Sequence, residues 1–267
     1  MPTQPTSSPI VACRGLNKSF GGMAAVKDLS FDVPAGTVLG IGGPNGAGKT
    51  TLFELISGFV PADTGEILIG GQRTDRLPPH AICHLGVGRI FQSNAGFDTL
   101  SARHNVLLSA TYGRAGRLLP PLVFDQEARG QAESALELVG LRDRADAPTN
   151  TLSVLERKLL MIASAIATRP RVLLMDEPVG GLNPEEMDGV LEIVRRLNAD
   201  GMTILLIEHV MRFLIQLSQR VMIMHHGEKI YEGPADGLAH DDAVKTVYLG
   251  ERMSRRLAGF QQQGAGA

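Results

Sequence analysis

A glycine-rich segment near the start of the chain has the residue types and spacing that bind phosphate. It reads GPNGAGKT over residues 43–50 and fits the pattern G-x-x-x-x-G-K-[ST]. Glycines let successive backbone N–H groups point at phosphate oxygens, and a following helix adds its positive dipole end. In this pattern Lys49 reaches the β- and γ-phosphates, and the Thr50 hydroxyl holds Mg²⁺. The sequence therefore predicts a nucleoside triphosphate site formed by Gly43, Pro44, Asn45, Gly46, Ala47, Gly48, Lys49, Thr50 and Thr51.

The context of this segment supports a function. An apolar run at residues 37–41 precedes it, and an apolar-periodic segment begins at Thr51. This is the order of strand, loop and helix that phosphate binding requires. A glycine-rich turn that matches by chance is therefore the weaker interpretation.

A second chemical element is a pair of carboxylates at the end of an apolar run. Residues 171–178 read RVLLMDEP, and Asp176 and Glu177 end a predicted buried strand. Residues at the carboxyl end of a central parallel strand face the crevice where ligands bind. We expect Asp176 to hold Mg²⁺ and Glu177 to accept a proton from the attacking water. The alternative is that the pair merely ends a strand before Pro178.

Two polar residues complete a possible sensor of the γ-phosphate. Gln92 follows the run VGRIF at residues 87–91, and His209 follows the apolar run at residues 204–207. Both are expected at the rim of the same crevice, where Gln92 could also join Thr50 and Asp176 around Mg²⁺. Alone, each would be interpreted as a surface or capping residue. Their position relative to the other motifs favours a catalytic role.

Composition excludes several other classes of protein. The chain has 267 residues, of which 43% are hydrophobic and 20% charged, as in an ordinary globular domain. A net charge of −2 gives no electrostatic case for nucleic acid as a partner. The two cysteines are too few for a disulfide framework and fit a reducing compartment. No apolar run approaches 18 residues, and the start lacks signal-peptide features, so we expect a protein that works at a membrane only through partners.

The predicted fold class is α/β, with a P-loop NTPase core containing a mixed, mainly parallel sheet. Short strands at residues 10–16, 26–33 and 65–71 suggest an antiparallel β subdomain, and residues 221–224 and 228–231 suggest a hairpin. Helical patterns occupy residues 102–112, 125–139 and 154–167. We therefore expect one domain over residues 10–250, with a core at 10–92 and 167–250, a helical subdomain at 93–166, and tails at 1–9 and 251–267.

Together these motifs resemble the ATP-binding subunits of ABC transporters. The matching segments appear in that family's order and approximate spacing: residues 43–51, Gln92, residues 151–153, residues 171–178, residues 180–183 and His209. The resemblance implies that the chain binds ATP and Mg²⁺ and hydrolyses ATP. It also implies that Phe20 stacks on adenine. Stacking tolerates any base, so this contact would position the nucleotide more than select it.

Within that family the chain looks most like the longer, LivG-type subunits of importers for branched-chain amino acids and related amides. The similarity lies in residues 180–184, 207–209 and 247–251. It implies a shorter LivF-type ATP-binding partner, two transmembrane permease subunits that dock on the helical region and the Gln92 loop, and indirectly a periplasmic binding protein. The protein would lie peripherally at the cytoplasmic face of the inner membrane. The ATPase of lipopolysaccharide exporters has a similar ending and remains the alternative.

The chain departs from its family at one motif. Members usually read Leu-Ser-Gly-Gly-Gln or Glu where this chain reads LSVLE at residues 152–156. Without the glycines the backbone cannot approach a phosphate as closely. Ser153 at a helix start should keep some attraction for the γ-phosphate held by a partner. The equally favoured alternative is a capping box in which Ser153 and Glu156 only start a helix.

This departure leads to an asymmetric dimer as the leading hypothesis. The family's ATP lies between one subunit's phosphate loop and the other's signature helix, so the defect would affect the partner's ATP. One competent site would then combine Lys49, Gln92, Asp176, Glu177 and His209 with the partner's signature. A regulatory subunit that binds ATP with little turnover, and a non-transport ABC ATPase, are the competing hypotheses.

Overall fold

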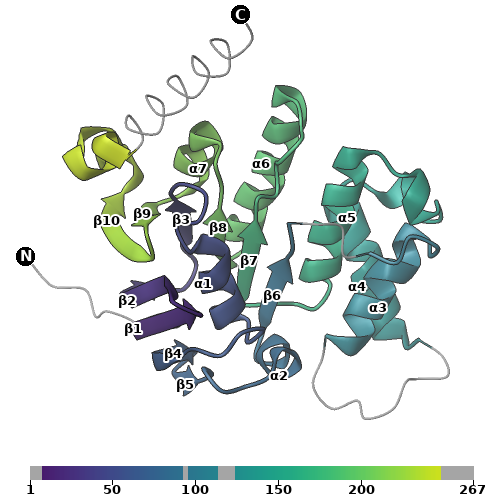
Figure 1. Ribbon diagram of the computed structural model, residues 1–267. Coiled ribbons are helices and arrows are strands. Elements are labelled where there is room, and N and C mark those ends of the chain that lie inside the picture. The colour runs from purple at the N-terminus through teal and green to yellow at the C-terminus, as the bar shows by residue number, and fades with distance from the viewer. Residues whose placement is uncertain (1–7, 93–95, 114–123, 248–267) are drawn as a thin grey trace, which may run out of the picture.

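The computed structural model describes residues 8–92, 96–113 and 124–247. Its strands form two sheets (Figure 1). The smaller sheet is antiparallel in the order β2-β1-β4-β5 and consists of β2 (Met23–Val33), β1 (Val11–Phe20), β4 (Thr64–Ile69) and β5 (Gln72–Arg73). This is the predicted antiparallel subdomain. The expected tails lie mostly outside the described residues.

The larger sheet carries the predicted buried strands. Its six strands follow the order β10 (Glu228–Pro234), β9 (Arg220–His225), β3 (Val38–Gly42), β8 (Thr203–Ile207), β7 (Val172–Asp176) and β6 (Val87–Ile90). β10 pairs antiparallel with β9, and the other pairs are parallel. The predicted β9–β10 hairpin turns through His226 and Gly227, both with positive φ, which is the backbone of a tight hairpin turn.

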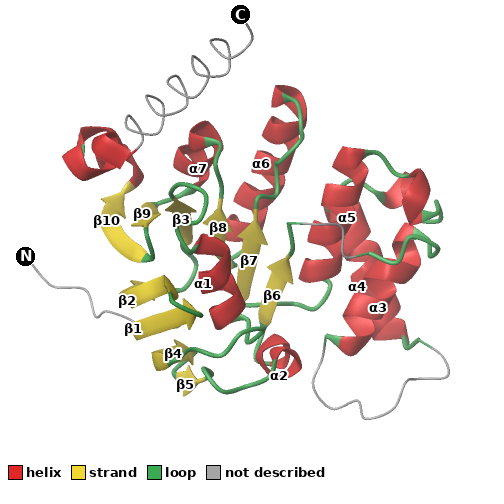
Figure 2. Ribbon diagram, in the orientation of Figure 1, coloured by secondary structure: helices red, strands yellow, loops and turns green. Residues whose placement is uncertain are grey.

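The helices form two groups (Figure 2). Three stand together beyond the β6 edge of the sheet: α3 (Ala102–Tyr112), α4 (Gln126–Leu138) and α5 (Val154–Ile166). The others belong to the sheet region: α1 (Lys49–Ile56), α2 (Pro79–His84), α6 (Pro184–Ala199) and α7 (Met211–Leu217). The described residues also form three short 3-10 helices, at Arg142–Arg144, Thr149–Thr151 and Ala235–His240. Side-chain caps at Ser101, Asp125, Ser153 and Asn183 start the longer helices, as their residue types favour.

The large sheet separates two hydrophobic cores. Along β7, Val172 and Leu174 belong to the core shared with α1 and the antiparallel sheet. Leu173 and Met175 belong to the core shared with the other helices. Successive side chains of a strand point to opposite faces, so an unbroken apolar run is needed when both faces are buried. This packing fixes the carboxyl ends of the strands, where the predicted functional residues follow.

Several elements begin or end at residues other than those predicted from the sequence. β1 and β2 extend to the turn at Gly21 and Gly22, because their polar outer faces interrupt the apolar pattern without ending the pairing. α1 begins at Lys49 instead of Thr51, with Gly48 in a left-handed conformation before it. Lys49 and Thr50 therefore lie in the first helical turn.

Candidate nucleotide-binding and catalytic site

Three strand ends bring the predicted motifs to one edge of the large sheet. Ile207 at the end of β8 pairs with Ile41 of β3 and with Asp176 of β7. Because neighbouring strands lie about 4.8 Å apart, Ile41 and Asp176 are separated by about 10 Å across the sheet. The phosphate loop, residues 43–50, starts directly after β3. The loop and the acidic pair therefore share this edge.

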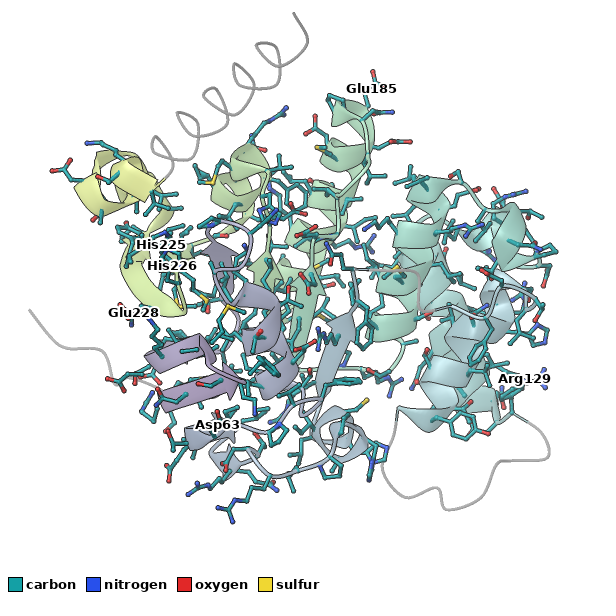
Figure 3. All side chains as sticks on the ribbon, viewed as in Figure 1. Asp63, Arg129, Glu185, His225, His226 and Glu228 are labelled. Carbon is teal, nitrogen blue, oxygen red and sulfur yellow. The ribbon has the colours of Figure 1, made fainter. Side chains whose placement is uncertain are left out.

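The phosphate loop is held between two neighbouring segments. A Cβ atom at Gly43 would lie 2.1 Å from the carbonyl oxygen of Met224, and one at Gly48 would lie 2.1 Å from that of Ala25. Both glycines also have positive φ, so no other residue fits without strain. The N–H of Gly227 donates to the carbonyl of Ala47 at 3.1 Å. The end of β9 and the turn after it, where Figure 3 marks His225 and His226, thus support the loop.

Lys49 is directed into the loop that precedes it. Its ammonium group donates to the carbonyl oxygens of Gly43 at 2.7 Å and Pro44 at 2.8 Å. The residue is only 5% exposed. A buried ammonium in a glycine-rich loop at the start of a helix is an arrangement suited to binding phosphate. Thr50 and Thr51 follow it in the first turn of α1.

The carboxylate of Glu177 joins the two residues predicted to sense the γ-phosphate. The amide nitrogen of Gln92 donates to Oε2 at 2.8 Å, and Nε2 of His209 lies 2.7 Å from Oε1. Gln92, Glu177 and His209 follow β6, β7 and β8, respectively, so adjacent parallel strands bring them together. Glu177 has a φ of 51°, an uncommon conformation for a residue with a side chain. The strand ends thus direct both polar groups at one carboxylate.

Asp176 is buried beside this group. It is 1% exposed, and its two carboxylate oxygens accept no hydrogen bond from the described residues. Burial raises the pKa of Asp176, while the nearby charges of Arg89 and Lys49 oppose that rise. A buried carboxylate that lacks donors, next to a phosphate loop, fits an oxygen ligand of Mg²⁺.

Two further residues, neither of them predicted, hold the loops that follow β7 and β8. Glu208 is 2% exposed and accepts the N–H groups of Val179 at 3.1 Å, His209 at 3.1 Å and Val210 at 3.4 Å. Its burial raises its pKa. Lys158 on α5 donates to the carbonyl of Glu177 at 3.0 Å. A charge directly after a buried strand could have drawn attention to Glu208, but no pattern in the sequence indicates the contact of Lys158.

Two predicted residues stand apart from this group. Phe20 is 48% exposed and pairs with Met23 at the tip of the β1–β2 hairpin. The same hairpin adjoins the phosphate loop at Ala25. Ser153 starts α5, which lies across β6 and β7 from α1 (Figure 2). The predicted capping box is present: Ser153 N–H donates to Glu156 at 2.7 Å, and Glu156 N–H donates to the Ser153 hydroxyl at 3.2 Å.

Comparison with known families agrees with the motifs. The family model for the ABC transporter matches residues 26–180, which is more than half of the chain. The chain belongs to the ABC transporter ATP-binding family. The resemblance stated from the sequence is therefore confirmed, and this ABC protein is an ATPase. None of its described helices has the length and hydropathy needed to cross a membrane.

Curated relatives of this ABC protein match over nearly their whole length. It is 34% identical to the high-affinity branched-chain amino acid transport ATP-binding protein BraF of Pseudomonas aeruginosa. It is 33% identical to LivG of Escherichia coli, which has the same descriptive name. Both alignments cover 92% of this chain and 99% of the relative.

Solved structures show the same fold. The ADP conformation of an ATP-binding cassette of an ABC transporter superposes with a TM-score of 0.83 at 28% identity, over 91% of this chain and 100% of that one. A nucleotide-free ATP-binding cassette from an ABC transporter superposes with a TM-score of 0.82 at 28% identity, over 90% of this chain and 98% of that one. The predicted fold class, an α/β cassette with an antiparallel subdomain and a helical part, is confirmed.

Proposed function

We propose that this chain is the ATP-hydrolysing subunit of an importer for branched-chain amino acids or related amides. The two curated relatives are named for branched-chain amino acid transport, and their alignments leave no large part of either protein unmatched. The observation that carries hydrolysis is the carboxylate of Glu177, held by Gln92 and His209 beside the phosphate loop.

In the proposed reaction each residue at the strand ends has one task. The phosphate loop and Lys49 bind the phosphates of ATP, and Glu177 accepts the proton of the attacking water. Gln92 and His209 orient that carboxylate and sense the γ-phosphate. Asp176, Thr50 and Gln92 would hold Mg²⁺, which when bound neutralises charge on the phosphates. Phe20, at the exposed hairpin tip, would stack on the adenine.

The signature segment supports an asymmetric dimer. The capping box holds Ser153 at the start of α5, and Val154, which is 58% exposed, presents a branched side chain where the family has glycine. We infer that this helix serves the partner's ATP poorly, whereas this chain's own ATP meets the partner's intact signature. The partner would be a shorter LivF-type subunit. The same segment favours a second candidate function, a regulatory subunit with little turnover.

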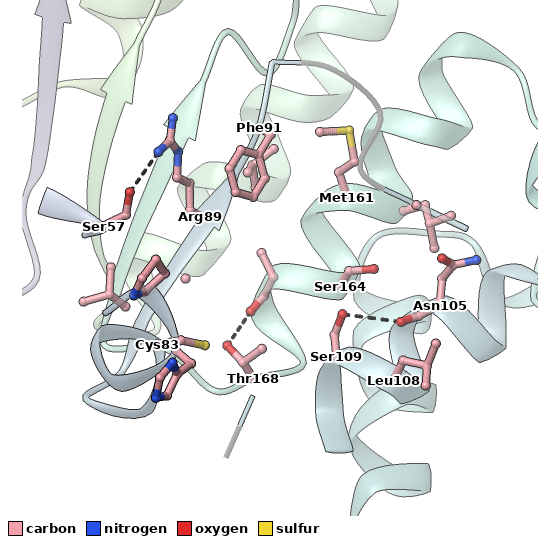
Figure 4. Close-up of a pocket in the computed structure, with 18 of the residues that line it drawn as sticks. Ser57, Cys83, Arg89, Phe91, Asn105, Leu108, Ser109, Met161, Ser164 and Thr168 are labelled. Carbon is pink, nitrogen blue, oxygen red and sulfur yellow. Dashed lines mark hydrogen bonds between the residues drawn. The ribbon is translucent and has the colours of Figure 1, made fainter. Parts of the chain in front are cut away.

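The proposed assembly also contains two permease subunits and, indirectly, a periplasmic binding protein. A cavity of about 390 Å³ separates α2 and β6 from the helical group (Figure 4). Its lining is mainly apolar and includes Phe59, Phe91, Phe97, Leu108 and Met161. An apolar groove can receive the apolar face of a short helix, which in this assembly a permease would supply. The chain would then lie at the cytoplasmic face of the inner membrane without entering it.

Transport by the reconstituted complex tests the substrate. The chain, its shorter partner, the permeases and the binding protein are placed in vesicles, and uptake of labelled leucine is measured with ATP. Uptake that stops when Lys49 is replaced by alanine supports the proposal. ATP hydrolysis without uptake of any branched-chain amino acid or amide would contradict the substrate, and export of a lipid would favour the exporter alternative.

The asymmetry is tested by restoring glycine at the signature. ATP binding and hydrolysis are measured on one heterodimer before and after the paired change Val154→Gly and Leu155→Gly. We expect the original heterodimer to bind two ATP and hydrolyse one, and the variant to gain turnover at the second site. No turnover at either site of the original would favour the regulatory alternative.

A further inference from the structure

Arg89 on β6 touches three parts of the molecule that the proposed function treats separately. Its guanidinium lies 3.9 Å from the carboxylate of Asp176 and donates to the hydroxyl of Ser57 at 2.8 Å. Ser57 is the C-cap residue of α1, the helix that begins in the phosphate loop. The third contact is with the rings of Phe59 and Phe91, which line the cavity beside the helical group.

The two rings hold the guanidinium in place. The central carbon of Arg89 lies 5.5 Å from the Phe59 centroid and 4.8 Å from the Phe91 centroid. The rings themselves meet edge to face with centroids 5.4 Å apart. A guanidinium near aromatic faces is attracted to the ring quadrupole, and more strongly where water is excluded. Figure 4 shows Arg89 between Phe91 and Ser57, with its guanidinium bonded to the Ser57 hydroxyl.

The contact with Asp176 is electrostatic and buried. The Arg89 side chain is 8% exposed and that of Asp176 is 1% exposed, and no described residue donates a hydrogen bond to the aspartate. Arg89 is therefore a buried cation beside a carboxylate that, under the proposed function, binds Mg²⁺, and its charge acts on Asp176 more strongly than that of Lys49. Two cations that share one buried carboxylate repel each other, because the dielectric screening there is weak.

We propose that Arg89 is a positioning residue that holds the carboxylate of Asp176, opposes Mg²⁺ there, and makes Mg²⁺ affinity depend on the aromatic wall formed by Phe59 and Phe91. This inference rests on the proposed Mg²⁺ site. A change at Phe59, which lies beyond the opposite end of α1 from the phosphate loop, alters Mg²⁺ affinity because it frees the guanidinium to move relative to Asp176. The cavity and the metal site are thereby coupled through one side chain.

Nucleotide binding, measured apart from hydrolysis, tests this coupling. A fluorescent ATP analogue is titrated against the full chain in EDTA and then at increasing Mg²⁺. With Arg89→Met we expect ATP affinity in EDTA to fall about threefold, since a positive charge near the phosphates is lost. The Mg²⁺ concentration at half-saturation should also fall, by about tenfold, since the competing cation is gone. A general loss of structure would weaken both.

Three further variants complete the test. Phe59→Leu keeps the charge and should lower the Mg²⁺ half-saturation about threefold. Arg89→Lys should lie between Arg89→Met and the wild type, and it replaces the methionine variant if that variant fails to fold. Arg76→Met, which removes an arginine with a 92% exposed side chain, is the matched control and should leave both affinities unchanged.

The outcomes separate this inference from the site on which it rests. If Asp176→Asn leaves the Mg²⁺ dependence unchanged, the proposed metal site itself is wrong. If Asp176→Asn changes it while Arg89→Met and Arg89→Lys match the wild type, only the role of Arg89 is overturned. A weaker Mg²⁺ affinity in Arg89→Met would likewise overturn the competition between the two cations.

Discussion

Replacing Glu177 with glutamine separates proton transfer from folding at the site. The carboxylate accepts one hydrogen bond on each oxygen, from Gln92 at 2.8 Å and from His209 at 2.7 Å. Glutamine keeps one acceptor oxygen for His209. Its new amide nitrogen can donate to Gln92 once the Gln92 amide turns to present its oxygen. Both bonds survive, so the free energy of unfolding should change by less than about 1 kcal/mol.

The catalytic effect of the same change should be large. An amide cannot accept the proton of the attacking water, and a positioned general base contributes about 10²–10⁴ in rate. At about 1.4 kcal/mol for each factor of ten, the barrier should rise by about 3–5 kcal/mol. We expect ATP to bind normally and to be hydrolysed at least about 100-fold more slowly by the dimer with its partner.

Three measurements on the same preparation test this prediction. They are ATP affinity, phosphate release and the free energy of unfolding in urea, with Glu185→Gln as the control. Glu185 is an exposed glutamate at the outer end of α6 (Figure 3), so its loss should change none of the three. Turnover of the Glu177 variant within twofold of the wild type would refute the role of this residue as the base.

Other changes address the residues that support the site. Glu208→Gln replaces one acceptor oxygen with a donor, so at least one N–H group of Val179, His209 or Val210 loses its acceptor, but the change also removes a buried charge. ATP turnover should therefore fall about tenfold, while the free energy of unfolding changes by less than about 2 kcal/mol. Unchanged turnover would contradict the role of Glu208 in holding these loops. Lys158→Met removes the donor to the Glu177 carbonyl, and it also removes a partly buried charge, since burial lowers the pKa of Lys158. ATP turnover should therefore fall about tenfold while the midpoint of unfolding stays nearly constant. A loss of stability that accounts for all of the rate loss would refute this. Asn105→Ala deletes an amide that is only 5% exposed and that forms hydrogen bonds with the N–H and the carbonyl of Phe97 and with the hydroxyl of Thr149. Denaturation in urea should show that the free energy of unfolding falls by about 3 kcal/mol. A decrease of less than about 1 kcal/mol would show that water replaces these bonds.

Most of the fold could be predicted because its local patterns agree with its packing. β7 and β8 read as unbroken apolar runs, and both are completely buried. The capping box at Ser153 sets the start of α5 as its residue types predict. The start of α1 was missed by two residues, since the helix begins inside the phosphate loop, where glycine and lysine give no apolar periodicity.

The residues of the candidate site could be predicted only where they belong to a recognisable motif or follow a predicted strand. Lys49, Asp176 and Glu177 belong to recognisable segments, and parallel strands bring Gln92 and His209 to Glu177. The supporting contacts carry no such signal. Lys158 lies on a helix whose sequence does not show which loop it faces, and its bond to the Glu177 carbonyl depends on how α5 packs against the sheet. Contacts of this kind follow from tertiary packing and need the structure.

The edge where the motifs meet also breaks several rules that the rest of the fold obeys. Glu177 adopts a left-handed backbone, a conformation that costs about 1–3 kcal/mol, and Asp176 and Glu208 are buried carboxylates. Two hydrogen bonds hold that strained residue. Its N–H donates to the carbonyl of Ile207, and its carbonyl accepts from the ammonium of Lys158. Strain of this size persists only where the surroundings are rigid, and the strands before these residues pack on both faces. Stability from the two cores therefore keeps the carboxylates in positions that isolated segments would not adopt. We infer from this combination a functional site and not a strand terminus alone.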